Sequence, residues 1–132
     1  MLDITRARAA NAGVAVDLRE GDAQTLPFDD ASFDTVVCTL GLCGMPDDRA
    51  AVAEMFRVLR PGGKLLILDH IGSDRRWLHL GQRLVEKITV RFGEHLTRRP
   101  LPLVEQAGFD VEHTERLKLG TIERVSATKP GQ

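Results

Sequence analysis

The sequence predicts an α/β fold that ends in an antiparallel hairpin. Two apolar runs, 32–40 and 64–69, have the character of buried strands, and a segment with helical periodicity connects them. A strand, a crossover helix and a second strand form a right-handed parallel unit, because the chain returns to the same sheet only in that way. Two strand-like runs near the end, 111–119 and 121–127, are separated by Gly120, which is typical of a hairpin.

Length and composition indicate one globular domain over residues 1–132. The chain carries 18 Lys+Arg and 19 Asp+Glu, and 42% of its residues are hydrophobic, which suits a single core. The near balance of charge excludes a general nucleic-acid-binding surface. Two cysteines are too few for a disulfide scaffold, so we expect reduced thiols in a cytoplasmic protein. The apolar runs fall short of the roughly 18 residues that cross a bilayer, so we expect neither a membrane helix nor a signal peptide.

Local signals predict the elements of the first half. Residues 3–12 are rich in good helix formers and end at Gly13, a typical residue after a helix. Residues 14–19 alternate apolar and polar side chains, which predicts a strand, and a turn-rich stretch follows. The crossover helix begins near Asp47, where a helix favours negative charge, and the Pro-Gly-Gly sequence at 61–63 ends it.

Two more helices are predicted in the second half. Apolar residues at helical spacing mark a helix over about 74–91, and a short helix over Pro100–Ala107 is closed by Gly108. The apolar residues of the longer helix are Trp77, Leu80, Leu84 and Ile88.

Positive charge is concentrated around the longer of these helices. Residues 74–99 contain 7 basic and 3 acidic residues. We expect the basic side chains to lie on one helix face, opposite the apolar stripe. Such a face either is simply solvated or meets a phosphate-bearing or anionic-lipid substrate. The residues of this face are Arg76, His79, Arg83, Lys87 and Arg91.

Candidate binding residues follow the predicted strands, because ligands of open α/β sheets bind beyond the carboxyl ends of the parallel strands. The segments at these places are 21–24, 39–44 and Asp69-His70. An acidic residue beside a glycine can accept a hydrogen bond from an adenine amino group or a ribose hydroxyl, and Ala23 leaves room for a flat ring. Asp22 is also a typical turn residue, and the residues alone leave both interpretations open.

Two sequence blocks carry a family resemblance. The first is Gly21-Asp22-Ala23-x-x-Leu26-Pro27-Phe28-x-Asp30-x-Ser32-Phe33-Asp34, and the second is Glu54-x-x-Arg57-Val58-Leu59-Arg60-Pro61-Gly62-Gly63. In series and at this spacing, they resemble the class I S-adenosylmethionine-dependent methyltransferases. Within that family the chain is most similar to the branch of the ubiquinone/menaquinone C-methyltransferases and the small phosphatidylethanolamine N-methyltransferase-like proteins. The resemblance extends over nearly the whole chain and is firmest over residues 20–70.

The resemblance implies a Rossmann-like methyltransferase sheet, S-adenosylmethionine as cofactor, and methyl transfer to a small-molecule or lipid-like acceptor. In the family the Asp of the Gly-Asp-Ala block binds the adenine amino group, which assigns that role to Asp22. The loop after the next strand lines the methionine end of the cofactor, and Leu42 and Cys43 then face the adenine or the substrate. The positions that match the family's cofactor contacts are Gly21, Asp22, Ala23, Thr39, Leu40 and Gly41.

Two histidines are candidate catalytic residues. His70 ends a predicted strand, and histidine titrates near neutrality, which suits a general base or a substrate contact; a plain strand-end histidine is the alternative. His95 lies in a segment that resembles one near the substrate pocket of the phosphatidylethanolamine-methyltransferase-like proteins. Cys43 fits a buried small hydrophobe better than a nucleophile. The histidines lack the spacing of zinc ligands, so we expect no metal.

The sequence departs from the family pattern at its start. It contains neither the glycine-rich Asp/Glu-x-Gly-x-Gly loop nor the second strand with its ribose-binding acid. We therefore expect an N-terminally truncated sheet that lacks about half of the cofactor contacts, with a gap of roughly 14 Å between the strands over 14–19 and 32–40. To pair the exposed edges, the chain is expected to form a homo-oligomer, by association or segment exchange, or to rearrange its N-terminal third. A non-catalytic dimerising or regulatory module is the alternative function.

Overall fold

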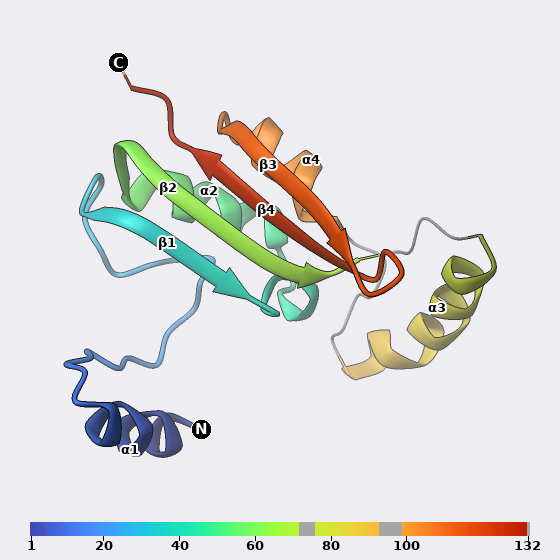
Figure 1. Ribbon diagram of the computed structural model, residues 1–132, viewed down its shortest axis with the longest axis horizontal. Coiled ribbons are helices and arrows are strands. Elements are labelled where there is room, and N and C mark those ends of the chain that lie inside the picture. The colour runs from blue at the N-terminus through green and yellow to red at the C-terminus, as the bar shows by residue number, and fades with distance from the viewer. Residues whose placement is uncertain (72–75, 93–98, 132) are drawn as a thin grey trace.

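A four-stranded mixed sheet forms the centre of the computed structural model, which describes residues 1–71, 76–92 and 99–131 (Figure 1). The strand order is β1-β2-β4-β3. β1 (Phe33–Thr39) pairs in parallel with β2 (Leu59–His70), while β4 (Ile122–Thr128) runs antiparallel to both β2 and β3 (Asp110–Leu117). The predicted α/β class, the parallel unit and the antiparallel hairpin at the end are therefore confirmed.

Two helices cover one face of this sheet. α2 (Asp48–Val58) and the short α4 (Pro100–Gln106) lie behind the strands in Figure 1. The core lies between these helices and the sheet. Its fully buried side chains include Val52, Val104, Leu59, Leu65, Ile67 and Val125.

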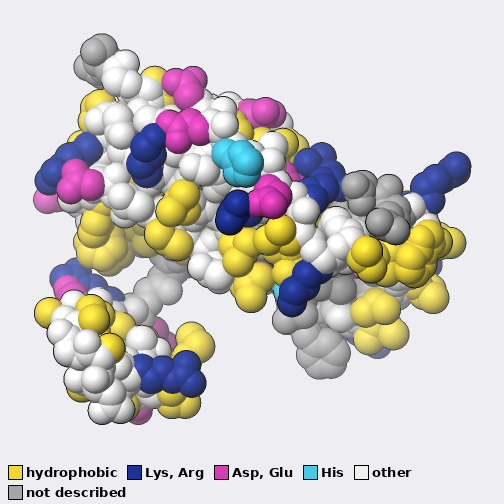
Figure 2. All heavy atoms as spheres, in the orientation of Figure 1, with side chains coloured by type: hydrophobic (Ala, Val, Ile, Leu, Met, Phe, Trp, Pro, Cys, Tyr) yellow, Lys and Arg dark blue, Asp and Glu magenta, His cyan; other side chains and the backbone are white. Residues whose placement is uncertain are grey.

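The other face of the sheet is uncovered by the described residues. Along β2, buried Leu65 and Ile67 alternate with exposed Leu66, and Val37 of β1 is also exposed. Figure 2, seen from this side, shows hydrophobic side chains at the surface of this face. The sheet therefore has one packed face and one face that is open among the described residues.

The start of α2 is capped by a charged side chain, as its sequence predicts, whereas its end is held by a cation from a distant part of the chain. The carboxylate of Asp47 accepts a hydrogen bond from the backbone N–H of Ala50 at 2.9 Å, which caps the start of the helix. At the other end, the Lys129 ammonium donates to the carbonyls of Phe56 and Leu59, both at 2.8 Å. A cation at this end also interacts favourably with the helix dipole.

The Pro-Gly-Gly sequence at 61–63 lies inside β2 and not in a turn before it. The ladder pairs Phe33 with Leu59 and then Thr35 with Lys64, so a bulge contains the intervening residues of β2. Gly63 sits at the tightest point: a Cβ there would lie 2.8 Å from the carbonyl oxygen of Arg60. β2 thus begins five residues earlier than the strand predicted over 64–69.

The strand predicted over 14–19 is wrong. α1 (Leu2–Ala12) ends at Gly13 as predicted, with a left-handed φ of 65°, and stands apart from the sheet in Figure 1. Residues 14–19 then run as a non-helical segment without ladder pairing. Alternation orients side chains, but a strand also needs a neighbouring backbone, and β1 pairs only with β2 among the described residues. The rest of the N-terminal part consequently joins the sheet only through the loop that enters β1.

The helix predicted over 74–91 corresponds to α3 (Arg76–Thr89), followed by a 3-10 turn, η2 (Val90–Phe92). A second 3-10 turn, η1 (Leu42–Gly44), follows β1. None of the helices in the described ranges is long and apolar enough to cross a membrane.

Candidate functional site

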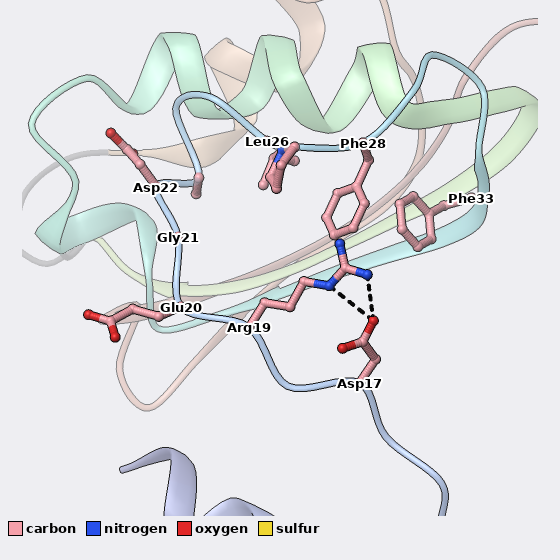
Figure 3. Close-up of a pocket in the computed structure, with 10 residues that line it drawn as sticks. Asp17, Arg19, Glu20, Gly21, Asp22, Leu26, Phe28 and Phe33 are labelled. Atoms are coloured by element: carbon pink, nitrogen blue, oxygen red, sulfur yellow. Dashed lines mark hydrogen bonds and ion pairs between the residues drawn. The ribbon is translucent and has the colours of Figure 1, made fainter.

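Two neighbouring hollows share the wall formed by Glu20, Gly21, Asp22 and Ala23. The first, of about 360 Å³, lies between this segment and a hydrophobic cluster in the same loop (Figure 3). The second, of about 500 Å³, lies between this segment and residues 44–46, where η1 ends. The sequence analysis singled out the segment 21–24 on one side of the second hollow and, on the other side, only Gly44, because these residues follow predicted strands.

Asp22 is held by a local turn, and this turn leaves one of its carboxylate oxygens available. Its Oδ1 accepts hydrogen bonds from the backbone N–H of Gln24 at 2.9 Å and from the Gln24 side chain at 3.0 Å. These two bonds, the backbone one first, lower the pKa of Asp22, so that the carboxylate is charged at neutral pH. Among the described residues, Oδ2 has no hydrogen-bond partner. The interpretation of Asp22 as a turn residue is thus correct, and it leaves an acceptor for a ligand.

The far wall of the first hollow is aromatic. The rings of Phe28 and Phe33 meet edge to face with their centroids 4.9 Å apart. The guanidinium of Arg19 lies 5.2 Å from the centroid of Phe28 and pairs with Asp17 at 2.7 Å. In Figure 3 the Arg19 guanidinium lies between the Phe28 ring and the Asp17 carboxylate, so the lining of the hollow combines apolar and charged groups.

Two charged residues of α2 hold the loop that carries this aromatic wall. The Glu54 carboxylate accepts from the backbone N–H of Leu26 at 2.8 Å and from Arg57 at 2.7 Å. Arg57 in turn donates to the carbonyls of Leu26, at 3.0 Å, and Phe28, at 2.7 Å. Its guanidinium is the main reason that the pKa of Glu54 falls from 4.5 to about 2. We call these two residues the loop clamp.

Buried Asp69 fixes the turn after β1. This carboxylate is 1% exposed, and its Oδ2 accepts from the backbone N–H groups of Leu42 at 2.6 Å and Cys43 at 3.2 Å. The other oxygen accepts from the N–H of His70 at 2.8 Å. Because Gly44 is the last residue of η1, Asp69 positions one side of the second hollow from within the core.

The loop residues predicted for the methionine end of a cofactor are divided among different surroundings. Thr39 lines a separate groove of about 420 Å³ on the open sheet face. Leu40 has a left-handed φ of 51° and is exposed. Gly41 immediately precedes η1, and a Cβ built on it would lie 3.3 Å from the Sγ of Cys38. Leu42 and Cys43 are buried, and neither lines the hollows beside Asp22. Cys43 is the buried small residue that its sequence context predicts.

The structure does not bring the histidine candidates to these hollows. His70 lines a recess of only about 10 Å³ beside Asp69 and Arg99, which is too small for a substrate. His95 lies outside the described residues. Within the described ranges there is no cluster of three or more His, Cys, Asp or Glu side chains that could hold a metal ion.

The loop clamp and Asp69 position the backbone that forms the walls of the hollows, and the sequence analysis missed these roles. Glu54 and Arg57 lie three residues apart on a predicted helix, which is the spacing of an ion pair, but their contacts reach a loop 28 to 31 residues away in sequence. The sequence indicates the role of Asp69 more clearly, because an acid at the end of an otherwise apolar strand needs a polar partner.

Comparisons with known proteins show which family the chain resembles. Residues 1–67 match the family model described as a methyltransferase domain. The chain is 45% identical over 69 residues to the demethylmenaquinone methyltransferase of Deinococcus radiodurans. This alignment covers 52% of this chain and 29% of that protein. It is also 45% identical over 71 residues to the ubiquinone/menaquinone biosynthesis C-methyltransferase UbiE of Saccharophagus degradans, covering 52% of this chain and 28% of that protein. The matched region therefore spans less than a third of the length of these relatives.

Among solved structures, a Bacillus halodurans protein assigned as a methyltransferase superposes with a TM-score of 0.82. The superposition covers 98% of this chain and 78% of that one, at 21% sequence identity. This likeness shows that the fold is shared.

Proposed function

The chain belongs to the methyltransferase domain family, and on that premise we propose that it forms part of an S-adenosylmethionine-dependent methyltransferase. One observation carries the proposal: Gly21, Asp22 and Ala23 form the common wall of two hollows, and an oxygen of Asp22 is available there as an acceptor.

The residues around Asp22 suit the nucleoside end of this cofactor. An adenine amino group is a hydrogen-bond donor, and a charged carboxylate is a strong acceptor for it. Ala23 and Leu26 supply small and apolar surfaces for a flat ring, and a Cβ built on Gly21 meets nothing within 4 Å. The loop clamp keeps this wall in place, because it binds the loop backbone at Leu26 and Phe28.

In methyl transfer the cofactor supplies a methyl group on a sulfonium, which an acceptor attacks in line. The protein then has to bind the nucleoside, orient the acceptor and exclude water. In the proposal, Asp22 binds the adenine amino group of the cofactor, and the segment 39–41 borders the methionine end of the cofactor. His95 remains a candidate base or acceptor contact, whereas the recess beside His70 is too small for an acceptor.

We propose a small-molecule or lipid-like acceptor of the quinone type. The relatives from Deinococcus radiodurans and Saccharophagus degradans support this class, since their names refer to demethylmenaquinone and to ubiquinone/menaquinone biosynthesis. We also propose that the protein works in the cytoplasm, which is supported by its two buried free cysteines, Cys38 and Cys43.

We propose further that the free edge of β1 pairs with a second copy of the chain. β1 bonds to β2 on one side only among the described residues, and an unpaired edge is a template for another strand. Sedimentation equilibrium tests this. We expect a mass about twice the 14.6 kDa of the monomer, whereas a monomer at all concentrations contradicts the pairing.

Calorimetric titration with S-adenosylmethionine tests the cofactor site. We expect a dissociation constant below about 100 μM. In Asp22→Asn the affinity should fall by at least about tenfold, because a hydrogen bond to a charged acceptor contributes about that much to binding. Asp22→Asn is the informative variant: its carbonyl oxygen can still accept from Gln24, while an amide donor replaces the oxygen offered to adenine. Asp29→Ala, which removes another exposed carboxylate from the same loop, is the control.

Two results would contradict this assignment. Unchanged affinity in Asp22→Asn would show that the adenine site lies elsewhere. No binding at millimolar cofactor would favour the non-catalytic alternative for these 132 residues.

A further inference from the structure

The apolar side of α3 faces solvent. The four apolar side chains that the sequence spaces as a core-facing stripe are each between 64% and 71% exposed, and no residue of this helix is buried. In Figure 1, α3 projects from the end of the sheet, and Figure 2 shows hydrophobic side chains over its outer surface. The stripe consists of Trp77, Leu80, Leu84 and Ile88.

The side of α3 that is turned toward the protein is mainly polar. The Gln82 amide donates to the backbone carbonyl of Ile71 at 3.0 Å, which ties the helix to the end of β2. The half-buried residues of the helix are Leu78, His79, Gln82, Glu86 and Thr89. An ordinary surface helix packs its apolar side on the core and turns its polar side to water. In α3 this order is reversed, so its apolar surface is available to something outside the chain.

Cationic side chains border the exposed stripe. Arg83 and Lys87 line the same shallow hollow as Trp77, Leu80 and Leu84. The expectation that the basic residues lie opposite the stripe is therefore wrong for these two. Residues three apart on a helix are separated by only about 60°, so Leu80 and Arg83, like Leu84 and Lys87, lie next to each other. The outer surface of α3 thus combines an apolar stripe with positive charge along its border.

We propose that α3 docks in the interface of an anionic lipid bilayer. A helix with an apolar stripe, a Trp within it and Lys or Arg at its border lies in the plane of the interface, with the cations at the lipid head groups. At 14 residues α3 is too short to cross a bilayer, so it would lie along the surface.

The charge pattern favours a lipid surface over a second copy of the helix. Two copies that meet through the stripe would bring Arg83 and Lys87 close to their own equivalents, which costs electrostatic energy. A bilayer with anionic head groups instead pairs with these cations while it covers the stripe. Docking there would also place the protein where a lipid-like acceptor resides, although the proposal does not depend on the methyltransferase assignment.

Trp77 makes the docking directly measurable, because it is the only tryptophan and the chain has no tyrosine. The purified chain is titrated with phosphatidylcholine vesicles that contain or lack phosphatidylglycerol. With the anionic vesicles we expect a blue shift of the emission and protection from acrylamide quenching. Raising the salt concentration should weaken the binding, since exposed charges are screened. No shift with anionic vesicles would overturn the proposal.

Variants separate the two contributions to binding. Leu84→Asp should lower the partition coefficient by about tenfold or more, because it removes a buried leucine from the lipid contact. Lys87→Glu should lower it about fivefold or more on anionic vesicles only. Ile4→Asp on α1, an equally exposed apolar residue on a different helix, is the control and should bind like the parent chain.

The same variants distinguish binding to a lipid surface from self-association of the chain through the stripe. The three variants should keep the far-ultraviolet spectrum of the parent, as their side chains are exposed. A blue shift of Trp77 that grows with protein concentration without vesicles, and that Leu84→Asp abolishes, would overturn the proposal in favour of self-association. Equal binding by Leu84→Asp and the parent would overturn it as well.

Discussion

Replacing Asp69 by asparagine tests whether one buried carboxylate holds the turn after β1. The wild-type side chain accepts three backbone hydrogen bonds, two from η1 through Oδ2 and one from His70 through Oδ1. Asparagine preserves the shape and one acceptor oxygen. If that oxygen stays with His70, an NH₂ group then faces the N–H groups of Leu42 and Cys43, donor against donor.

The expected cost follows from these contacts. A buried backbone N–H that loses its acceptor costs about 1–3 kcal/mol, and two N–H groups are affected. We therefore expect Asp69→Asn to lower the free energy of unfolding by about 2–5 kcal/mol. The matched control is Asp34→Asn, which removes an exposed ion pair with Arg60 and should cost about 0–1 kcal/mol.

Urea unfolding followed by circular dichroism measures both variants. Thiol labelling gives a second, local readout, because Cys43 is buried within η1 and should react faster when the turn detaches. If Asp69→Asn unfolds at the same urea concentration as Asp34→Asn and Cys43 stays protected, the carboxylate is not the anchor described above.

Three further predictions concern the loop clamp and the bulge in β2. The Arg57 guanidinium lowers the pKa of Glu54 from 4.5 to about 2. The stability that the charged Glu54 contributes is therefore present above pH 4.5 and is lost as the pH falls toward 2. Glu54→Gln should remove this acid dependence of the free energy of unfolding, which urea titrations at several pH values measure. Arg57→Ala should speed amide hydrogen exchange at residues 26–28 of the loop before β1, whereas Arg60→Ala should not, because Arg60 contacts the loop only at Ala31; equal exchange at 26–28 in both would contradict the clamp. Gly63→Ala should cost about 1–3 kcal/mol in the free energy of unfolding because its Cβ meets backbone at 2.8 Å, while Gly44→Ala, with open space around it, should unfold like the parent.

The sequence predicts most of the fold because the elements bury side chains at regular spacing. The runs that became β1 and the second half of β2 have apolar centres at 36–38 and 65–68, and α2 has both charged ends and an apolar face. The expectation that these strands are buried on both faces is wrong, because Val37 and Leu66 are exposed on the open face of the sheet. The segment 14–19 has the alternation of a strand but forms none. Periodicity reports on which side chains share a face, whereas a strand also depends on a partner that this segment does not find.

The candidate site was predictable only where its chemistry is local. Asp22 makes its turn with Gln24, two residues away, and this pattern can be read from neighbouring letters. The loop clamp instead joins α2 to a loop distant in sequence, so its partners become visible only in the fold. For the same reason the sequence suggests an apolar stripe on α3 but not the direction in which it faces.

The position of β4 has a consequence for how the protein is made. β4 is the last of the four described strands in sequence order, yet it lies in the interior of the sheet, and β3 reaches the other described strands only through it. On the ribosome, β1, α2 and β2 can associate early, but β3 must wait until β4 has emerged. The nascent chain therefore exposes half-assembled β structure until residues 122–128 have emerged, and during that interval chaperones have the most to protect.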